Sequence, residues 1–249
     1  MSRNYDEELD DSGNNSNERY GYQFDYDVMH PFMLRKLIQH KSVGKALEVG
    51  SHFGVFTEKI LKYFPDLTCV EVSKQAFNEL KKRIGKRAQL YNSPIEKIAD
   101  LEQYDIIILT HVLEHVDDPV KILEVLKKLL TSDGILFIVV PSATAASRQI
   151  AVEMGLISHL TAVTDAEKQH GHQRTYTLDT LKRDAREAGL HILNTGGIFF
   201  KGLANFQFDQ AIPAGIVSPE YLEACYTLGD KYPELCASLY LVGARLDLE

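Results

Sequence analysis

The chain has 249 residues, of which 45% are hydrophobic and 25% charged, a composition typical of an ordinary globular protein with one large domain or two small ones. Its net charge is −8, and residues 1–26 alone hold seven acids against two bases. The remainder is nearly neutral and lacks the basic surface with which proteins bind nucleic acid, so nucleic acid is not an expected partner.

No apolar run approaches the roughly 18 residues of a membrane span, and the acidic N-terminus is unlike a signal peptide. We therefore expect a cytoplasmic protein with no membrane partner. The three cysteines, Cys69, Cys225 and Cys236, are odd in number and scattered along the chain. We interpret them as buried free thiols rather than as a disulfide or a zinc site.

The chain divides into three parts by composition. Residues 1–19 are rich in Asn, Asp, Glu and Ser and are predicted to be a disordered acidic tail, because they bury too little apolar surface to offset the entropy of ordering. Residues 20–42 interleave aromatic residues with acids and continue into a helical pattern, which predicts an N-terminal arm and a first helix. Residues 43–249 are predicted to form the main domain.

Short apolar strands alternate with amphipathic helices through this main domain. The expected strands cover residues 46–49, 67–72, 89–92, 104–110, 135–140, 191–194 and 238–244. The expected helices cover residues 55–64, 74–84, 119–130, 145–154, 177–188 and 221–228. Near-continuous apolar strands are typical of a parallel sheet with helices on both faces, so the predicted fold class is a doubly wound α/β domain.

The first motif with chemical content reads Glu48-Val-Gly50-Ser-His52-Phe-Gly54 and lies where the first strand meets the first helix. Glycines there allow a tight turn and a close approach to a ligand, although a pair of glycines is as typical of a plain turn. Two of the three glycines of a dinucleotide loop are missing, which argues against a nicotinamide-dependent oxidoreductase. Glu71 ends the next strand, where a carboxylate either accepts the hydroxyls of a ribose or is simply a solvated acid.

The strongest signal lies in two later stretches. Residues 104–119 read YDIIILTHVLEHVDDP, and residues 129–141 read LLTSDGILFIVVP. Together they resemble the class I S-adenosylmethionine-dependent methyltransferases, in the group whose fourth strand ends in a VLEHV-x-DP signature. Residues 170–181, HGHQRTYTLDTL, are similar to a later segment of that group. The resemblance covers about residues 43–195.

This resemblance implies a Rossmann-like sheet of seven strands, with the last strand antiparallel and inserted beside the strand that starts at Ile135. It implies S-adenosylmethionine as the cofactor and methyl transfer to an O or N atom of a small molecule, such as a secondary metabolite or a sugar. It also implies a lid at about residues 155–176. An insertion at about residues 198–236 then shapes either the acceptor site or the contact of a homodimer.

The resemblance assigns cofactor positions residue by residue. His52 stands where the family usually has a further glycine, and the turn that begins at Ser93 lacks the usual Asp. The N-terminal arm has two interpretations. It is a flap over the cofactor, with Tyr26 and His30 facing the cofactor, or it packs on the domain for stability. The implied cofactor-binding residues are Tyr26, His30, Glu48, Gly50, His52, Gly54, Glu71, Val72, Ser93, Pro94, Ile95, Leu109, Thr110 and His111.

Methyl transfer requires the acceptor, the methyl group and sulfur to be aligned, and it often requires a base that removes a proton from the acceptor. Histidine suits that task because its ordinary pKa lies near the working pH. The candidate catalytic residues are His111, His115 and His172, with His111 the first choice. As alternatives, His115 braces its loop, and His172 orders the lid together with His170. Glu114 and His115 could also share a divalent metal, as for a quinone or catechol-like acceptor, but the sequence identifies no third ligand and no metal is predicted.

Overall fold

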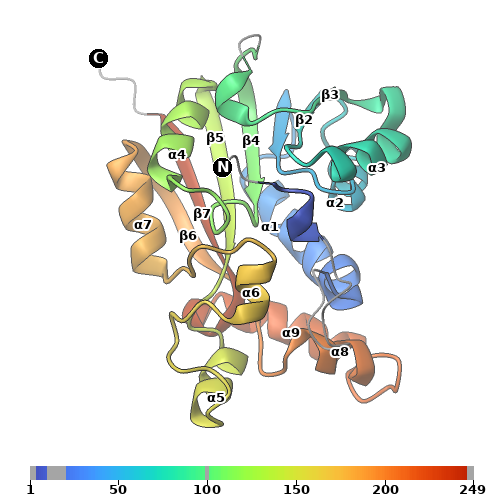
Figure 1. The fold of residues 1–249 in the computed structure, drawn as a ribbon, viewed down its shortest axis with the longest axis vertical. Helices are drawn as coiled ribbons and strands as arrows, with labels where there is room; N and C mark the ends of the chain where they lie inside the picture. Colours follow the sequence, from blue (N-terminus) through green and yellow to red (C-terminus); the bar gives the residue numbers. More distant parts are fainter. Residues whose placement is uncertain (1–3, 10–20, 99–100, 246–249) are drawn as a thin grey trace.

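The computed structural model describes residues 4–9, 21–98 and 101–245 (Figure 1). Most of the predicted tail lies outside these ranges. Residues 4–9 are described, and they include a short 3-10 turn, η1 (Glu7–Leu9). The Asp6 carboxylate accepts a hydrogen bond of 2.6 Å from the Ser73 hydroxyl, which docks this segment on the main domain.

Seven strands form one sheet, in the order β3-β2-β1-β4-β5-β7-β6. Strand β7 runs antiparallel between β5 and β6, and the other strands of the sheet are parallel to one another. This confirms the predicted fold class and the position of the last strand. The strands are β1 (Ala46–Val49), β2 (Leu67–Val70), β3 (Gln89–Tyr91), β4 (Tyr104–Thr110), β5 (Leu130–Pro141), β6 (Leu190–Phe200) and β7 (Cys236–Arg245).

Strands β5, β6 and β7 are longer than the sequence pattern predicted, β5 and β6 by the most. Strand β6 continues to Phe200 because it pairs with β7 along almost its whole length, across a register shift between Ile192 and Asn194. Strand β5 begins at Leu130, which pairs with Tyr104 before another register shift. Pairing partners, which a single strand does not reveal, therefore set these ends.

Helices cover both faces of the sheet (Figure 1). The two cores contain alternate residues of each strand: Ile106 and Ile108 belong to one, and Ile107 and Leu109 to the other. On the first face lie α1 (His30–His40), α2 (Val55–Ile60) and α3 (Lys74–Ile84); on the second lie α4 (Pro119–Lys128) and α7 (Leu178–Glu187). Helix α2 ends at Ile60, earlier than predicted, and turn residues 61–63 lead from it toward Pro65.

The N-terminal arm packs against the C-terminal insertion. The arm contains a π-helical turn, η2 (Asp25–Met29), and the insertion contains α8 (Asn205–Ala211) and α9 (Pro219–Gly229). The ring of Phe24 stacks on Phe208 with centroids 4.4 Å apart, and Phe32 stacks on Tyr226 at 4.7 Å. Each aromatic pair adds roughly 1 kcal/mol beyond the area that it buries.

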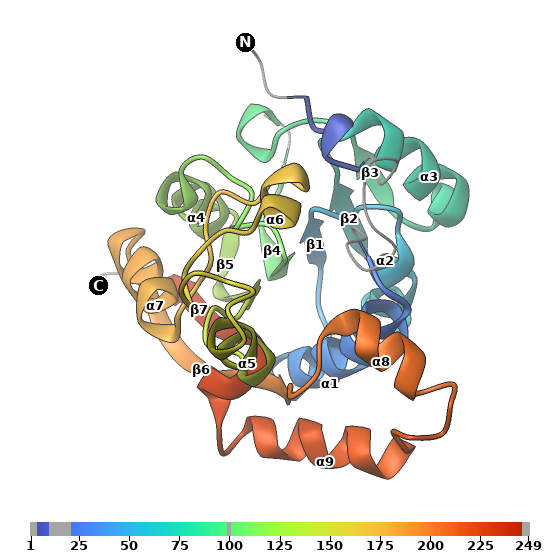
Figure 2. The same cartoon turned by 60° about the horizontal axis from the view of Figure 1, so that its bottom comes forward.

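The remaining helices, α5 (Ala146–Glu153) and α6 (Asp165–Gln169), lie with α8 around the ends of β1 and β4 (Figure 2). All three cysteines are buried and free, as predicted. Among the described residues, no helix has the length and apolar character needed to cross a membrane.

Candidate functional site

A cavity of about 1130 Å³ lies at the carboxyl ends of β1, β2 and β4, and the lid, the arm and α8 complete its walls. Every residue predicted to bind cofactor or to act in catalysis lines this cavity, except two. Gly54 caps α2 with φ +78° and packs against Leu80 of α3. Leu109 is fully buried in the core. Successive side chains of a strand point to opposite faces, so Leu109 lies on the face of β4 opposite to Ile108 and Thr110.

The loop between β1 and α2 adopts a backbone that favours glycine. Gly50 has φ +80°, and a Cβ atom there would lie 2.4 Å from Cγ2 of Val112. His52 also has a positive φ, +49°, at the place where the resembled family usually has glycine. The side chain of His52 lines the cavity, and burial lowers its pKa to about 4, so its imidazole is neutral.

Glu71 follows β2 and joins this loop to the next one. Its two carboxylate oxygens accept backbone N–H groups from His52, at 2.7 Å, and from Ser73, at 2.8 Å. Burial raises the pKa of Glu71, while these hydrogen bonds oppose the rise. Because a carboxylate oxygen can accept more than one hydrogen bond, Glu71 retains acceptor capacity on the cavity wall.

Glu48 lies behind the same loop, where its carboxylate accepts the Thr57 hydroxyl at 2.6 Å. Burial raises its pKa to about 7, against the opposing effect of this hydrogen bond. The folded protein therefore keeps a proton on Glu48 that the unfolded chain loses near pH 4.5. Below pH 4.5 both states hold the proton, and the raised pKa costs no stability. The free energy of unfolding falls as the pH rises from 4.5 to 7, and it stays lower above pH 7.

We expect the free energy of unfolding of wild type, relative to Glu48→Gln, to fall by about 3 kcal/mol between pH 4.5 and pH 7. The substitution keeps the shape but cannot ionise. Urea unfolding at a series of pH values measures the difference, and Glu79→Gln, at an exposed position, is the control. A constant difference between wild type and Glu48→Gln over this range would contradict the prediction.

His111 follows β4 with φ +55° and is held between two side chains. Its Nδ1 lies 3.2 Å from Oε1 of Glu114, and its Nε2 lies 3.4 Å from the Ser238 hydroxyl on β7. Burial of Glu114 would raise the pKa of its carboxyl, but the hydrogen bond from His111 and the charges of nearby histidines hold that pKa at about 2. An ionised carboxylate only accepts hydrogen bonds, so Nδ1 of His111 carries the proton and Nε2 is the basic nitrogen of the neutral ring.

The lid is tied to the loop that follows β4 by two residues. The Gln173 N–H donates to the carbonyl oxygen of Glu114 at 2.8 Å, and the Arg174 guanidinium donates to Leu113, at 2.9 Å, and to Asp117, at 3.1 Å. These contacts bring His172 beside His115, with ring centroids 4.6 Å apart. His170 instead has its Nδ1 3.2 Å from the Glu8 carbonyl oxygen, in the N-terminal segment.

A second polar group lines the wall formed by the arm and the insertion. The Asn205 amide donates to both oxygens of Asp25, at 3.1 and 3.2 Å. Burial raises the pKa of Asp25, and it lowers the pKa of Lys201, whose ammonium is attracted by the Asp25 charge. No sequence pattern pointed to these residues, because each is an isolated polar side chain in a segment without a motif.

The family of methyltransferase domains matches residues 22–195 of this chain. Among curated relatives, nodulation protein S of Bradyrhizobium diazoefficiens is 31% identical over 101 residues, which are 40% of this chain and 48% of that protein. The ubiquinone biosynthesis O-methyltransferase of Actinobacillus pleuropneumoniae is 28% identical over 123 residues, which are 44% of this chain and 52% of that protein. The matches thus span about half the length of these two relatives.

Solved structures share the fold. The N-methyltransferase NodS from Bradyrhizobium japonicum, solved with S-adenosyl-L-homocysteine, has a TM-score of 0.60 and 17% identity, over 98% of this chain and all of that one. A methyltransferase from Thermotoga maritima, described as a possible histamine N-methyltransferase, has a TM-score of 0.61 and 14% identity, over 90% and 93% of the two chains. At these identities the likeness establishes the architecture of the sheet and its helices.

Proposed function

Because the chain belongs to the methyltransferase domain family, as a class I S-adenosylmethionine-dependent methyltransferase, we propose that it methylates a nitrogen or oxygen atom of a small polar molecule. One observation carries the proposal: a single cavity brings the glycine loop and Glu71 together with His111, a histidine oriented by a buried carboxylate. Secondary metabolites and sugars are acceptors of this kind.

The residues around the glycine loop fit the cofactor. Gly50 has no side chain and lets a ligand approach the backbone, and Glu71 has acceptor capacity for the two hydroxyls of a ribose. The cavity volume of about 1130 Å³ exceeds that of a typical small-molecule site, which supports joint binding of the cofactor and an acceptor. When bound, S-adenosylmethionine supplies an electrophilic methyl group on sulfur.

The chain itself contributes alignment and a base. Glu114 keeps the proton on Nδ1 of His111, so that Nε2 can accept a proton from an acceptor hydroxyl or ammonium group. The Ser238 hydroxyl, 3.4 Å away, orients the same ring from its other side. The lid covers this end of the cavity and reduces its contact with water.

The second polar group supports the proposed acceptor class. Asp25, Lys201 and Asn205 line the cavity on the side of the arm and insertion, and together they can bind a molecule that carries hydroxyl, amine or carboxylate groups. The names of the relatives include both an N-methyltransferase and an O-methyltransferase, which favours these two atoms without choosing between them. An assay that measures release of S-adenosylhomocysteine from a panel of small amines and alcohols tests the proposal. Binding of cofactor without turnover on any acceptor would contradict it.

We expect Glu71→Ala to weaken binding of S-adenosylmethionine and S-adenosylhomocysteine at least tenfold. The change removes hydrogen bonds from a charged acceptor, each of which contributes roughly 1.5–3 kcal/mol. Titration calorimetry measures the affinity, and Glu124→Ala, at an exposed position of α4, is the matched control. Wild-type affinity in a folded Glu71→Ala variant would show that Glu71 does not bind the ribose.

A further inference from the structure

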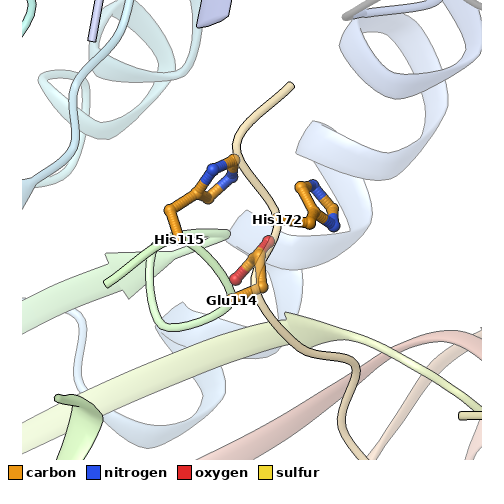
Figure 3. Close-up of side chains that lie close together, drawn as sticks. All are labelled: Glu114, His115 and His172. Carbon is orange, nitrogen blue, oxygen red and sulfur yellow. The ribbon is translucent and has the colours of Figure 1, made fainter. Parts of the chain in front are cut away.

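Three side chains with metal-binding atoms meet on the wall of the cavity. Glu114 and His115 come from the loop after β4, and His172 comes from the lid (Figure 3). Their potential ligand atoms all lie within 4.8 Å of one another. In Figure 3 the Glu114 carboxylate points toward the space between the two imidazole rings.

The hydrogen bonding of this cluster is incomplete. Glu114 is fully buried; its Oε1 faces His111, but its Oε2 has no hydrogen-bond partner among the described residues. Nδ1 of His172 is also buried, and no residue in the described part of the chain is its hydrogen-bond partner. An unsatisfied oxygen of a buried carboxylate is costly, so a ligand that binds this oxygen would be favoured.

From this geometry we propose that Glu114, His115 and His172 bind a divalent first-row transition-metal ion, such as Zn²⁺, Mn²⁺ or Co²⁺. Two imidazoles and one carboxylate suit these ions, whereas Mg²⁺ and Ca²⁺ prefer oxygen ligands alone. Metal–ligand distances of about 2.1 Å separate neighbouring ligand atoms by roughly 3 Å, so the side chains need to move by only about 1 Å.

The two oxygens of Glu114 then have separate tasks. Oε1 accepts the hydrogen bond from His111, and Oε2 binds the ion, so the site coexists with the orientation of His111. Three protein ligands leave at least one coordination position for water or for an oxygen atom of the acceptor. The metal site goes beyond the proposed function, because the ion can bind whether or not a methyl group is transferred.

The test uses the untagged 249-residue chain, freed of metal with a chelator. Visible absorption follows titration with Co²⁺, and calorimetry follows titration with Zn²⁺. Wild type is expected to bind one ion per chain, and His115→Ala, His172→Ala and Glu114→Gln are expected to bind it at least about tenfold more weakly. His159→Ala, in the same lid but exposed, is the matched control and should bind like wild type.

Circular dichroism identifies any variant that fails to fold, and if Glu114→Gln does so, the two histidine variants decide the question. The site is disproved if wild type binds neither ion, or if the histidine variants bind as tightly as His159→Ala. Affinity for S-adenosylhomocysteine, measured on the same samples, tests the proposed function separately. If the histidine variants lose metal binding but keep S-adenosylhomocysteine binding, the result supports both the metal site and the proposed function.

Discussion

His111→Gln is expected to lower turnover at least a hundredfold while leaving the affinity for S-adenosylhomocysteine nearly unchanged. A positioned general base contributes about 10²–10⁴-fold, and a glutamine amide can still hydrogen-bond but cannot take up a proton. Steady-state release of S-adenosylhomocysteine gives the rate, and calorimetry gives the affinity. His191→Gln, at an exposed position on β6, is the matched control for both measurements.

Near-normal turnover in His111→Gln would contradict the role of His111 as a base. The enzyme would then act by alignment alone, as it can for an amine that is already neutral in the pocket. Ser238→Ala tests the positioning of the ring, because it removes one partner of His111 without removing the imidazole. We expect this variant to lower turnover less than His111→Gln and to leave the affinity for S-adenosylhomocysteine unchanged.

Gly50→Ala is expected to reduce the free energy of unfolding by about 2–4 kcal/mol. A side chain at φ +80° is strained by roughly 1 kcal/mol, and the new Cβ would lie 2.4 Å from Val112, which adds an overpacking cost of about 1–3 kcal/mol. Urea unfolding measures the change. Any movement that relieves this contact also displaces the cofactor loop, so affinity for S-adenosylhomocysteine should fall as well.

Two further variants separate the strain from the contact. Gly215→Ala has a similar φ of +71° but no atom within 4 Å of the new Cβ, so its cost should stay near 1 kcal/mol. Val112→Ala removes the atom that Gly50→Ala would meet, so the double variant should recover part of the loss. Equal effects of Gly50→Ala and Gly215→Ala, with no recovery, would refute the close contact.

The sheet could be predicted from the sequence because its strands are nearly continuous apolar runs, and the family resemblance supplied their order. Residues 46–49, 74–84 and 104–110 begin and end as predicted: Gly50 follows the first, Ser73 and Gly85 flank the second, and the third is a continuous apolar run. The ends of β5 and β6 were wrong because they depend on their partners. Strand pairing is a property of two segments, and the pattern of one segment does not contain it.

The candidate site was predictable where it follows strand ends and unpredictable where distant segments meet. Glu71 and His111 could be found because both follow apolar strands at the same edge of the sheet. The approach of His172 to Glu114 depends on Gln173 and Arg174, whose hydrogen bonds tie the lid to the loop after β4. The motif at residues 170–181 identified the segment, but the contacts that the segment makes are known only from the structure.

The residues on the acceptor side could not be found from the sequence at all. Asp25 and Asn205 meet because the aromatic arm packs on the insertion, through contacts such as that of Phe24 with Phe208. Phe24 and Phe32 of the arm pack in the core, and Tyr26 and His30 line the cavity; a flap over the cofactor stays a prediction.

We expect the position of β7 to delay completion of the sheet in a newly made chain. Within the described ranges, strands β5 and β6 are joined only through β7, which follows both of them in the sequence. Strand β7 therefore leaves the ribosome after β5 and β6, although it lies between them in the sheet. Pairing between segments so far apart in the sequence is slow. Because Ser238 of β7 also contacts His111, the appearance of activity during synthesis or refolding would report the insertion of this strand.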